Sequence, residues 1–180
     1  MQNINICDNI GINDEGHLTF AGLDTVALAE KYGTPLYLMD EDKIREKVRI
    51  YKTAMAKYLP EGSKPEFASK AFSCRAVYRI MKEEGMNVDV VSSGEIYTAY
   101  TAGFPMENVF FHGNNKTDAD IAYAIENGVG CFVVDNEEEL YAIGFDDYLA
   151  RGGAIIMEWC ERVPYALPNE RLELHIEGSG

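Results

Sequence analysis

Between residues 64 and 141, short apolar runs alternate with stretches in which apolar residues recur every three or four positions. The first pattern is typical of buried strands and the second of amphipathic helices. The expected strands are KPEFASK, NVDVV, NVFFH and GCFVV. Each is followed by residues that can cap a helix, and the expected caps are Ser73, Ser92 or Ser93, Thr117 with Asp120, and Asp135 with Glu138.

The regular spacing of these strands predicts the fold class. The strands end near Lys70, Ser92, His112 and Asp135, which lie 22, 20 and 23 residues apart. Such short and even βα units favour a parallel (β/α)8 barrel of the TIM type over an open doubly wound sheet. A complete barrel takes roughly 250 residues, so about four units make a partial barrel. We therefore expect an α/β protein.

The flanking segments are predicted differently. Residues 1–20 are mixed and polar, and we expect an extended lead-in. Asp24 should cap a short helix that ends at Gly33, PLYLMD (35–40) should form a strand, and Asp40 should cap the next helix. After Gly144 the regular alternation of predicted strands and helices ends. We expect AIIMEW (154–159) and RLELHIE (171–177) to be strands of a short β-rich tail. The predicted parts are therefore a lead-in (1–20), a partial barrel (21–141) and a tail (142–180).

Composition narrows the classes of partner. The net charge is −14, from 16 Lys and Arg against 30 Asp and Glu. That charge argues against a nucleic-acid or anionic membrane surface, because little would neutralise phosphates. No apolar stretch approaches the roughly 20 residues that span a bilayer, and the first residues do not resemble a secretory signal. The four cysteines form no CxxC pair, so we expect reduced thiols in a cytoplasmic protein and no metal site.

Lys70 is the leading candidate for chemistry. It stands at the end of an apolar strand, and a lysine buried there would have a lowered pKa and react readily with an aldehyde. A buried ammonium would also need a partner, so Lys70 should lie within hydrogen-bond reach of Asp89 or Glu95. The alternative is a structural lysine that extends to solvent at the rim of the barrel or pairs with Asp89 or Glu95.

The next two strand ends supply the other candidates. Asp89 and Glu95 follow one strand, and their side chains could face the same mouth as Lys70. The alternative for Glu95 is ordinary helix capping together with a serine. His112 and Asn114 follow the next strand and are weaker candidates, because a lone histidine is more often structural. No GxxxxGK[ST], GxGxxG or HExxH pattern occurs, so nucleotide binding has no motif here.

Five blocks in one order resemble the diaminopimelate decarboxylases, which are fold-type-III pyridoxal-phosphate enzymes. The blocks are YGTPLYLMDEDKIRE, FASKAF, EEGMNVDVVSSGEIYTA, AGFPMENVFFHGNNKTDADIAYAIENGVG and FVVDNEEEL. The resemblance covers about residues 21–141 and implies that Lys70 holds pyridoxal 5′-phosphate covalently, with Asp89, Glu95 and His112 lining the cofactor site. It also implies a homodimer that decarboxylates a small amino acid, meso-diaminopimelate, to lysine.

The tail departs from that family. The family's later ring-stacking histidine, Gly-rich phosphate loop, pyridine-facing glutamate and β domain are not recognised after residue 141. Residues 137–178 instead resemble the carboxy-terminal end of the bacterial ATPase of tRNA threonylcarbamoyladenosine synthesis, through GFDDYL, the Glu158–Trp159 pair and LPNERLEL. We therefore expect a truncated or chimeric, inactive decarboxylase. The alternatives are a non-catalytic pyridoxal-phosphate-binding protein and a fragment of that ATPase.

Overall fold

The computed structural model describes residues 7–150, 154–157, 160, 164–165 and 167–175. The chain divides after Pro65 into two compact units, which are described separately.

The first unit begins with a small antiparallel sheet, where a lead-in was expected. Its strands are paired in the order β1 (Ile10–Ile12), β2 (Leu18–Phe20) and β3 (Leu23–Asp24). The turn between β1 and β2 is closed by the Asn13 side chain, whose Oδ1 accepts from the backbone N–H of Glu15 and of His17. The expectation for residues 1–20 was therefore wrong where the structure describes them.

The two helices of this unit begin at the expected caps. Asp24 caps α1 (Thr25–Tyr32), which ends at Gly33, and Asp40 caps α2 (Glu41–Tyr58). The predicted strand at 35–40 is wrong, because those residues belong to no β ladder. A strand needs a partner for its backbone groups, and here Tyr37 is 91% exposed. The apolar pattern alone could not show that a partner strand was missing.

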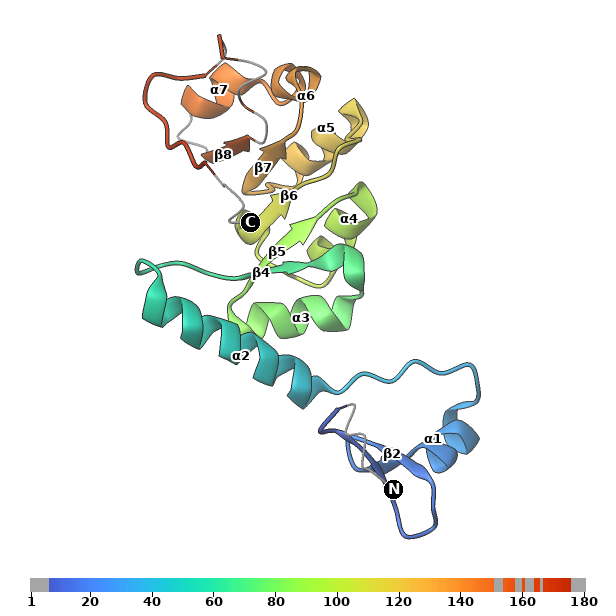
Figure 1. Ribbon diagram of the computed structural model, residues 1–180. Coiled ribbons are helices and arrows are strands. Elements are labelled where there is room, and N and C mark those ends of the chain that lie inside the picture. The colour runs from blue at the N-terminus through green and yellow to red at the C-terminus, as the bar shows by residue number, and fades with distance from the viewer. Residues whose placement is uncertain (1–6, 151–153, 158–159, 161–163, 166, 176–180) are drawn as a thin grey trace. The chain divides into compact units, whose positions relative to one another are not determined.

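The second unit is built on a parallel sheet (Figure 1). Its five strands are neighbours in chain order: β4 (Glu66–Ala68), β5 (Asn87–Val90), β6 (Val109–Phe111), β7 (Cys131–Val134) and β8 (Ala154–Met157). All four pairings are parallel. The predicted α/β class and the order of the first four strands are confirmed.

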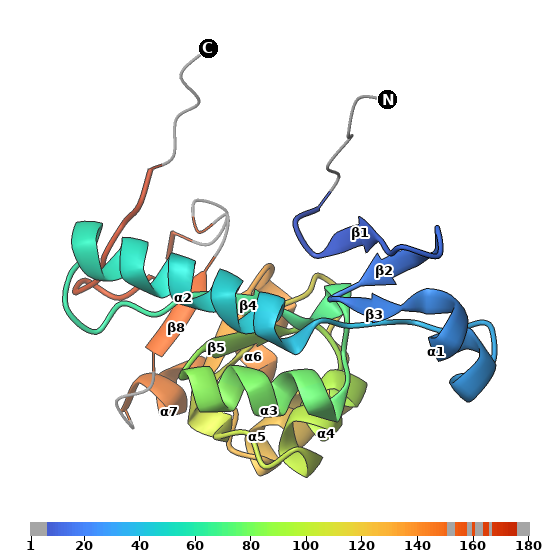
Figure 2. The same ribbon diagram turned by 90° about the horizontal axis from the view of Figure 1, so that it is seen from below.

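Helices lie between successive strands and cover one face of the sheet (Figure 2). They are α3 (Arg75–Glu84), α4 (Ser93–Thr101), α5 (Asp118–Glu126), α6 (Glu137–Ala142) and α7 (Phe145–Ala150), with 3-10 turns η1 (Ser69–Ala71) and η2 (Met106–Asn108).

Alternation along the strands separates the two faces of this sheet. Val88, Val90 and Phe111 are fully buried, whereas Asp89 and His112 are only partly buried. Successive strand side chains point to opposite faces, so Asp89 and His112 lie on the face opposite the buried core. Each buried Val or Phe contributes roughly 1.5–3 kcal/mol of burial free energy. The core therefore fixes the register that presents the polar face.

Two of the four predicted caps in this unit are confirmed. Ser92 accepts from the backbone N–H of Glu95, and Thr117 forms a capping box with Asp120. The other two were placed one residue too early. Cys74 and Asn136 occupy the cap positions instead.

Each displaced residue has another partner. The Ser73 hydroxyl donates to the Tyr78 hydroxyl at 3.3 Å. The Asp135 carboxylate lies 3.6 Å from the Lys116 ammonium, while Asn136 accepts from the backbone N–H of Glu139.

The tail is partly as expected. Residues 154–157 form β8, which extends the parallel sheet beyond β7, while Glu158 and Trp159 lie outside the described residues. The second expected strand is wrong for residues 171–175, which have no regular secondary structure and are exposed. In the described residues, no helix is both long and apolar enough to cross a membrane.

Candidate cofactor site

Lys70 lies in η1, directly after the carboxyl end of β4. The preceding residue, Ser69, is fully buried, and its hydroxyl donates to the backbone carbonyl of Asp89 at 2.8 Å. That bond fastens the turn that carries Lys70 to the neighbouring strand. The Lys70 side chain is exposed, so its amine is open to a ligand.

The expected contact of Lys70 with Asp89 or Glu95 is not formed. Within the described residues, no hydrogen bond or ion pair involves the Lys70 side chain. An exposed ammonium is hydrated and needs no protein partner. The expectation assumed a buried lysine, and the exposure of Lys70 removes that assumption.

Asp89 and His112 do approach one another. The Nδ1 of His112 lies 3.9 Å from the Oδ1 of Asp89, with the side chains 32% and 17% exposed. The backbone places them, because the N–H of His112 donates to the carbonyl of Val90 at 2.9 Å. Glu66 is exposed at the surface, but partial desolvation of its carboxyl raises its pKa, and the negative charge of Asp89 raises that pKa further. Glu66, Asp89 and His112 therefore form an acidic and imidazole cluster on this face of the sheet.

Glu95 has a capping role in this structure. Its Oε2 accepts from the backbone N–H of Val91 at 2.5 Å, where β5 leads into α4. The structure thus places Lys70, Asp89 and His112 at three successive strand ends, and it uses Glu95 to fasten the backbone between two of them. Asn114 is exposed in the loop after β6.

A buried ion cluster was not anticipated from the sequence. The Nζ of Lys116 lies 2.8 Å from the Oε2 of Glu139, and these side chains are 1% and 4% exposed. Both residues line a small polar hollow beside the first turns of α5 and α6. A lysine in the loop after a strand was the available signal, but its partner comes from the next βα unit.

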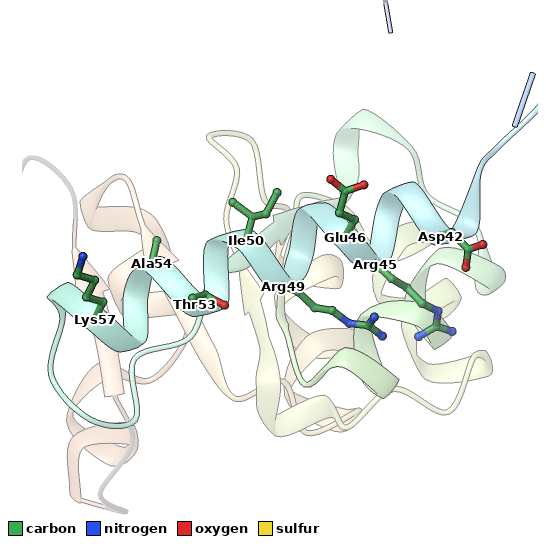
Figure 3. A pocket seen from close by; sticks show the side chains of 8 residues that line it. All are labelled: Asp42, Arg45, Glu46, Arg49, Ile50, Thr53, Ala54 and Lys57. Carbon is green, nitrogen blue, oxygen red and sulfur yellow. The ribbon is translucent and has the colours of Figure 1, made fainter. Parts of the chain in front are cut away.

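A second hollow follows one face of α2 (Figure 3). All of its lining residues belong to that single helix: Asp42, Arg45, Glu46, Arg49, Ile50, Thr53, Ala54 and Lys57. Binding sites are usually concave and formed by converging elements, so we assign no ligand to this helix face.

The second unit is thus a parallel βα sheet of the kind that forms part of a barrel, with Lys70 at one strand end and polar residues at the next two. Residues 41–148 match the family model described as pyridoxal-dependent decarboxylase, pyridoxal binding domain. Because this match covers more than half of the chain, the protein belongs to that family.

Similar proteins are diaminopimelate decarboxylases. The chain is 51% identical over 131 residues to the one of Halalkalibacterium halodurans, covering 72% of this chain and 29% of that relative. It is 48% identical over 130 residues to the one of Bacillus subtilis, covering 71% and 29%. The crystal structure of diaminopimelate decarboxylase from M. jannaschii superposes with a TM-score of 0.69 at 32% identity, covering 83% of this chain and 35% of that one. The chain thus spans about a third or less of the length of these relatives.

Proposed function

We propose that this chain is the lysine-bearing part of a decarboxylase that uses pyridoxal 5′-phosphate, with Lys70 as the cofactor lysine. The observation that carries the proposal is the position of Lys70 at the carboxyl end of a parallel strand, with Asp89 and His112 at the ends of the next two. Catalytic groups of such barrels come from these strand ends.

The residues present fit one side of that cofactor. The exposed amine of Lys70 would hold the cofactor through its aldehyde group, while Ser69 holds the turn against β5. The paired Asp89 and His112 offer a carboxylate and an imidazole to orient a polar ring. When bound, pyridoxal phosphate supplies the electron sink for loss of carbon dioxide. Glu95 contributes indirectly, by fixing the backbone between β5 and α4.

A labelling experiment tests the assignment of Lys70. The chain is mixed with substoichiometric pyridoxal phosphate, reduced with borohydride to make the carbon–nitrogen bond permanent, and mapped by mass spectrometry. We expect Lys70 to carry most of the label, although Lys64 and Lys82 are also exposed and serve as internal controls. Equal labelling of the three lysines would contradict the proposal, since any exposed amine reacts slowly with an aldehyde.

The substrate, assembly and location form the finer part of the proposal. The names of the similar proteins support meso-diaminopimelate as the amino acid that loses carbon dioxide to give lysine. We further propose the homodimer that the family resemblance implies, and a cytoplasmic location in keeping with the four free cysteines. Sedimentation analysis tests the dimer.

The origin of the tail is a separate proposal. We infer that residues 137–178 derive from a sequence like the tRNA-modification ATPase, and the GFDDYL and LPNERLEL blocks with the Glu158–Trp159 pair carry that resemblance. A nucleotide-binding assay with ATP and magnesium distinguishes the alternatives. Binding of ATP would favour the ATPase alternative. Labelling of the matching lysine in a longer relative of this chain that releases no carbon dioxide would favour a non-catalytic cofactor carrier.

A further inference from the structure

The loop after β6 differs from the loops on either side of it. Only two residues, 91–92 and 135–136, separate β5 from α4 and β7 from α6, whereas residues 112–117 separate β6 from α5. Each short loop is fastened by a glutamate in the following helix. Glu95 accepts from the N–H of Val91, and Glu139 accepts from the N–H of Asp135 at 3.2 Å.

The longer loop is fastened by Lys116 instead. Its side chain is 1% exposed and its Nζ contacts Glu139 Oε2 at 2.8 Å and Asp135 Oδ2 at 3.6 Å. The same ammonium donates to the carbonyl of Gly113 within its own loop. It also lies 5.7 Å from the ring centroid of Phe111. Lys116 therefore joins the loop after β6 to the loop after β7.

Burying this cluster costs desolvation free energy, so a gain in stability does not by itself explain why the cluster is there. Removing charges from water costs several kcal/mol for each ion, and an apolar replacement of a buried pair is often as stable. In addition, Glu139 Oε1 and Asp135 Oδ2 are buried and accept no hydrogen bond from the described residues. What the cluster does provide is a fixed position for the Gly113 carbonyl.

The Gly113 carbonyl is next to the candidate site. Gly113 has a φ of 117°, and a Cβ built on it would lie 3.3 Å from the carbonyl oxygen of Val91. The preceding residue, His112, is bound through its N–H to Val90 and faces Asp89. A shift of the Gly113 peptide would thus rotate the backbone that aims the His112 ring.

We propose that Lys116 is a positioning residue: paired with Glu139, it holds Gly113 so that His112 stays against Asp89. The role of this arrangement in cofactor binding rests on the proposed function, but the positioning itself does not.

The test uses the 180-residue chain without cofactor and isotope-labelled histidine. Lys116→Met removes the ammonium, Glu139→Gln weakens the pair more mildly, and Lys82→Met is the matched control. Lys82 also donates to a backbone carbonyl, that of Gly103 at 2.7 Å, but on an exposed surface. We expect both cluster variants to move the His112 ring signals in the NMR spectrum and to speed amide exchange at 113–116 by about tenfold or more. Lys82→Met should do neither.

The double variant Lys116→Met/Glu139→Gln sharpens the result. If the two residues act as one device, its effect on the His112 signals should be well below the sum of the single effects. Unchanged His112 signals in a folded Lys116→Met chain would overturn the proposal. So would unfolding of both single variants, because the pair would then be a requirement of the fold.

Lys70 labelling separates this proposal from the proposed function. Moved His112 signals with no preferred labelling of Lys70 in the unchanged chain would retain the positioning role and reject the cofactor lysine. Preferred labelling of Lys70 with unmoved His112 signals would do the reverse.

Discussion

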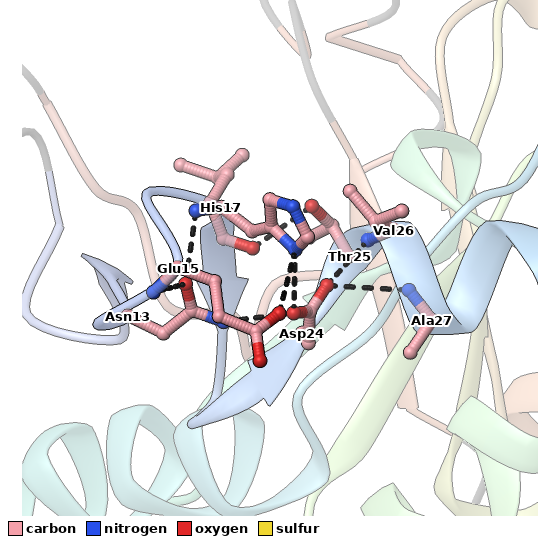
Figure 4. A network of polar contacts seen from close by, with 8 residues as sticks. Asn13, Glu15, His17, Asp24, Thr25, Val26 and Ala27 are labelled. Atoms are coloured by element: carbon pink, nitrogen blue, oxygen red, sulfur yellow. Dashed lines mark hydrogen bonds and ion pairs between the residues drawn. The ribbon is translucent and has the colours of Figure 1, made fainter.

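The Nδ1 of His17 lies 2.9 Å from the Oδ2 of Asp24 and links the hairpin of the first unit to the start of α1 (Figure 4). The same oxygen accepts from the Asn13 amide at 2.7 Å, while Asp24 Oδ1 caps the helix. One ligand atom each of Glu15, His17 and Asp24 lies within 4.8 Å of the others. The hydrogen bond accounts for the closeness of His17 and Asp24, and a 3.7 Å ion pair accounts for that of His17 and Glu15. The expectation of no metal stays a prediction.

The His17–Asp24 pair predicts a pH dependence of the hairpin. Its hydrogen bond raises the pKa of His17 above 6.5 and lowers the pKa of Asp24 from 3.8 to about 2. The His17 contribution is complete below pH 6.5 and is lost as pH rises through the raised pKa. The Asp24 contribution is complete above pH 3.8 and is lost as pH falls towards about 2. Stabilisation by the pair should therefore be greatest between those limits.

Asp24→Asn isolates the charge, because asparagine also caps helices well. We expect the pKa of His17 in the variant to fall towards 6.5, measured by NMR titration of its ring. In the unchanged chain, hydrogen-exchange protection of the β2 amides should decline as pH rises through the pKa of His17. In the variant this decline should be absent. A His17 titration identical to that of the unchanged chain would show that the pair does not form in solution.

Gly130 should tolerate no side chain. A Cβ at this position would lie 2.0 Å from the carbonyl oxygen of Glu107, where the chain passes close to η2. Gly130→Ala should lower the free energy of unfolding by about 1–3 kcal/mol, as other overpacked sites do. Urea denaturation measures the change.

Gly94→Ala is the control for Gly130→Ala. Gly94 lies in α4, and an added Cβ would have ordinary contact with the Ser92 hydroxyl at 3.8 Å. Alanine in a helix is favoured over glycine by roughly 0.5–1 kcal/mol, so this variant should be at least as stable as the original chain. Equal losses at both positions would mean that the close approach at Gly130 is absent.

One confirmed and one corrected helix cap can be checked in the same way. Thr117 accepts from the N–H of Asp120 and caps α5, so Thr117→Ala should cost about 0.5–2 kcal/mol of unfolding free energy. Ser73 was expected to cap α3 but makes no capping bond. Ser73→Ala should therefore change thermal stability much less than Thr117→Ala, and a larger loss at Ser73 would restore the original assignment.

The sequence predicted the parallel strands because their pattern is local. Val88 and Val90 alternate with Asp89 within one short run, and Gly85 ends the preceding helix in the left-handed conformation. The hairpin of residues 10–20 left a weaker signal, since its strands have three residues each. Its turn, Asn13 to Gly16, could have revealed it.

Contacts between different βα units could not be predicted from the local sequence pattern. Lys116 forms an ion pair with Glu139 of the next βα unit, and neither sequence segment alone indicates this partner. Similarly, β8 continues the sheet from β7 beyond the boundary that the sequence predicted at residue 141, and the family model itself matches as far as residue 148. A ladder uses backbone groups that every residue except proline carries, so a segment can extend an open sheet edge even where its side chains do not fit the recognised pattern.

The last prediction concerns turnover. We expect the 180-residue chain to release no measurable carbon dioxide from meso-diaminopimelate, even with excess pyridoxal phosphate. Orientation of reacting groups accounts for as much as roughly 7–11 kcal/mol of a catalysed barrier. In the described residues, the candidate site supplies Lys70, Asp89 and His112 on one side. The groups that the family uses to anchor the phosphate and the pyridine nitrogen are not recognised in this sequence.

Lys70→Ala is the comparison that makes this prediction sharp. Exposed amines elsewhere on the chain, such as Lys64 and Lys82, remain in the variant and provide the background of slow, unoriented reaction. Equal carbon dioxide release from both proteins is expected, because an amine that can capture the aldehyde cannot by itself fix the ring for loss of a carboxylate. Turnover well above that of Lys70→Ala would show that these three strand ends orient the cofactor sufficiently without the remaining groups, and the argument from orientation would then be wrong.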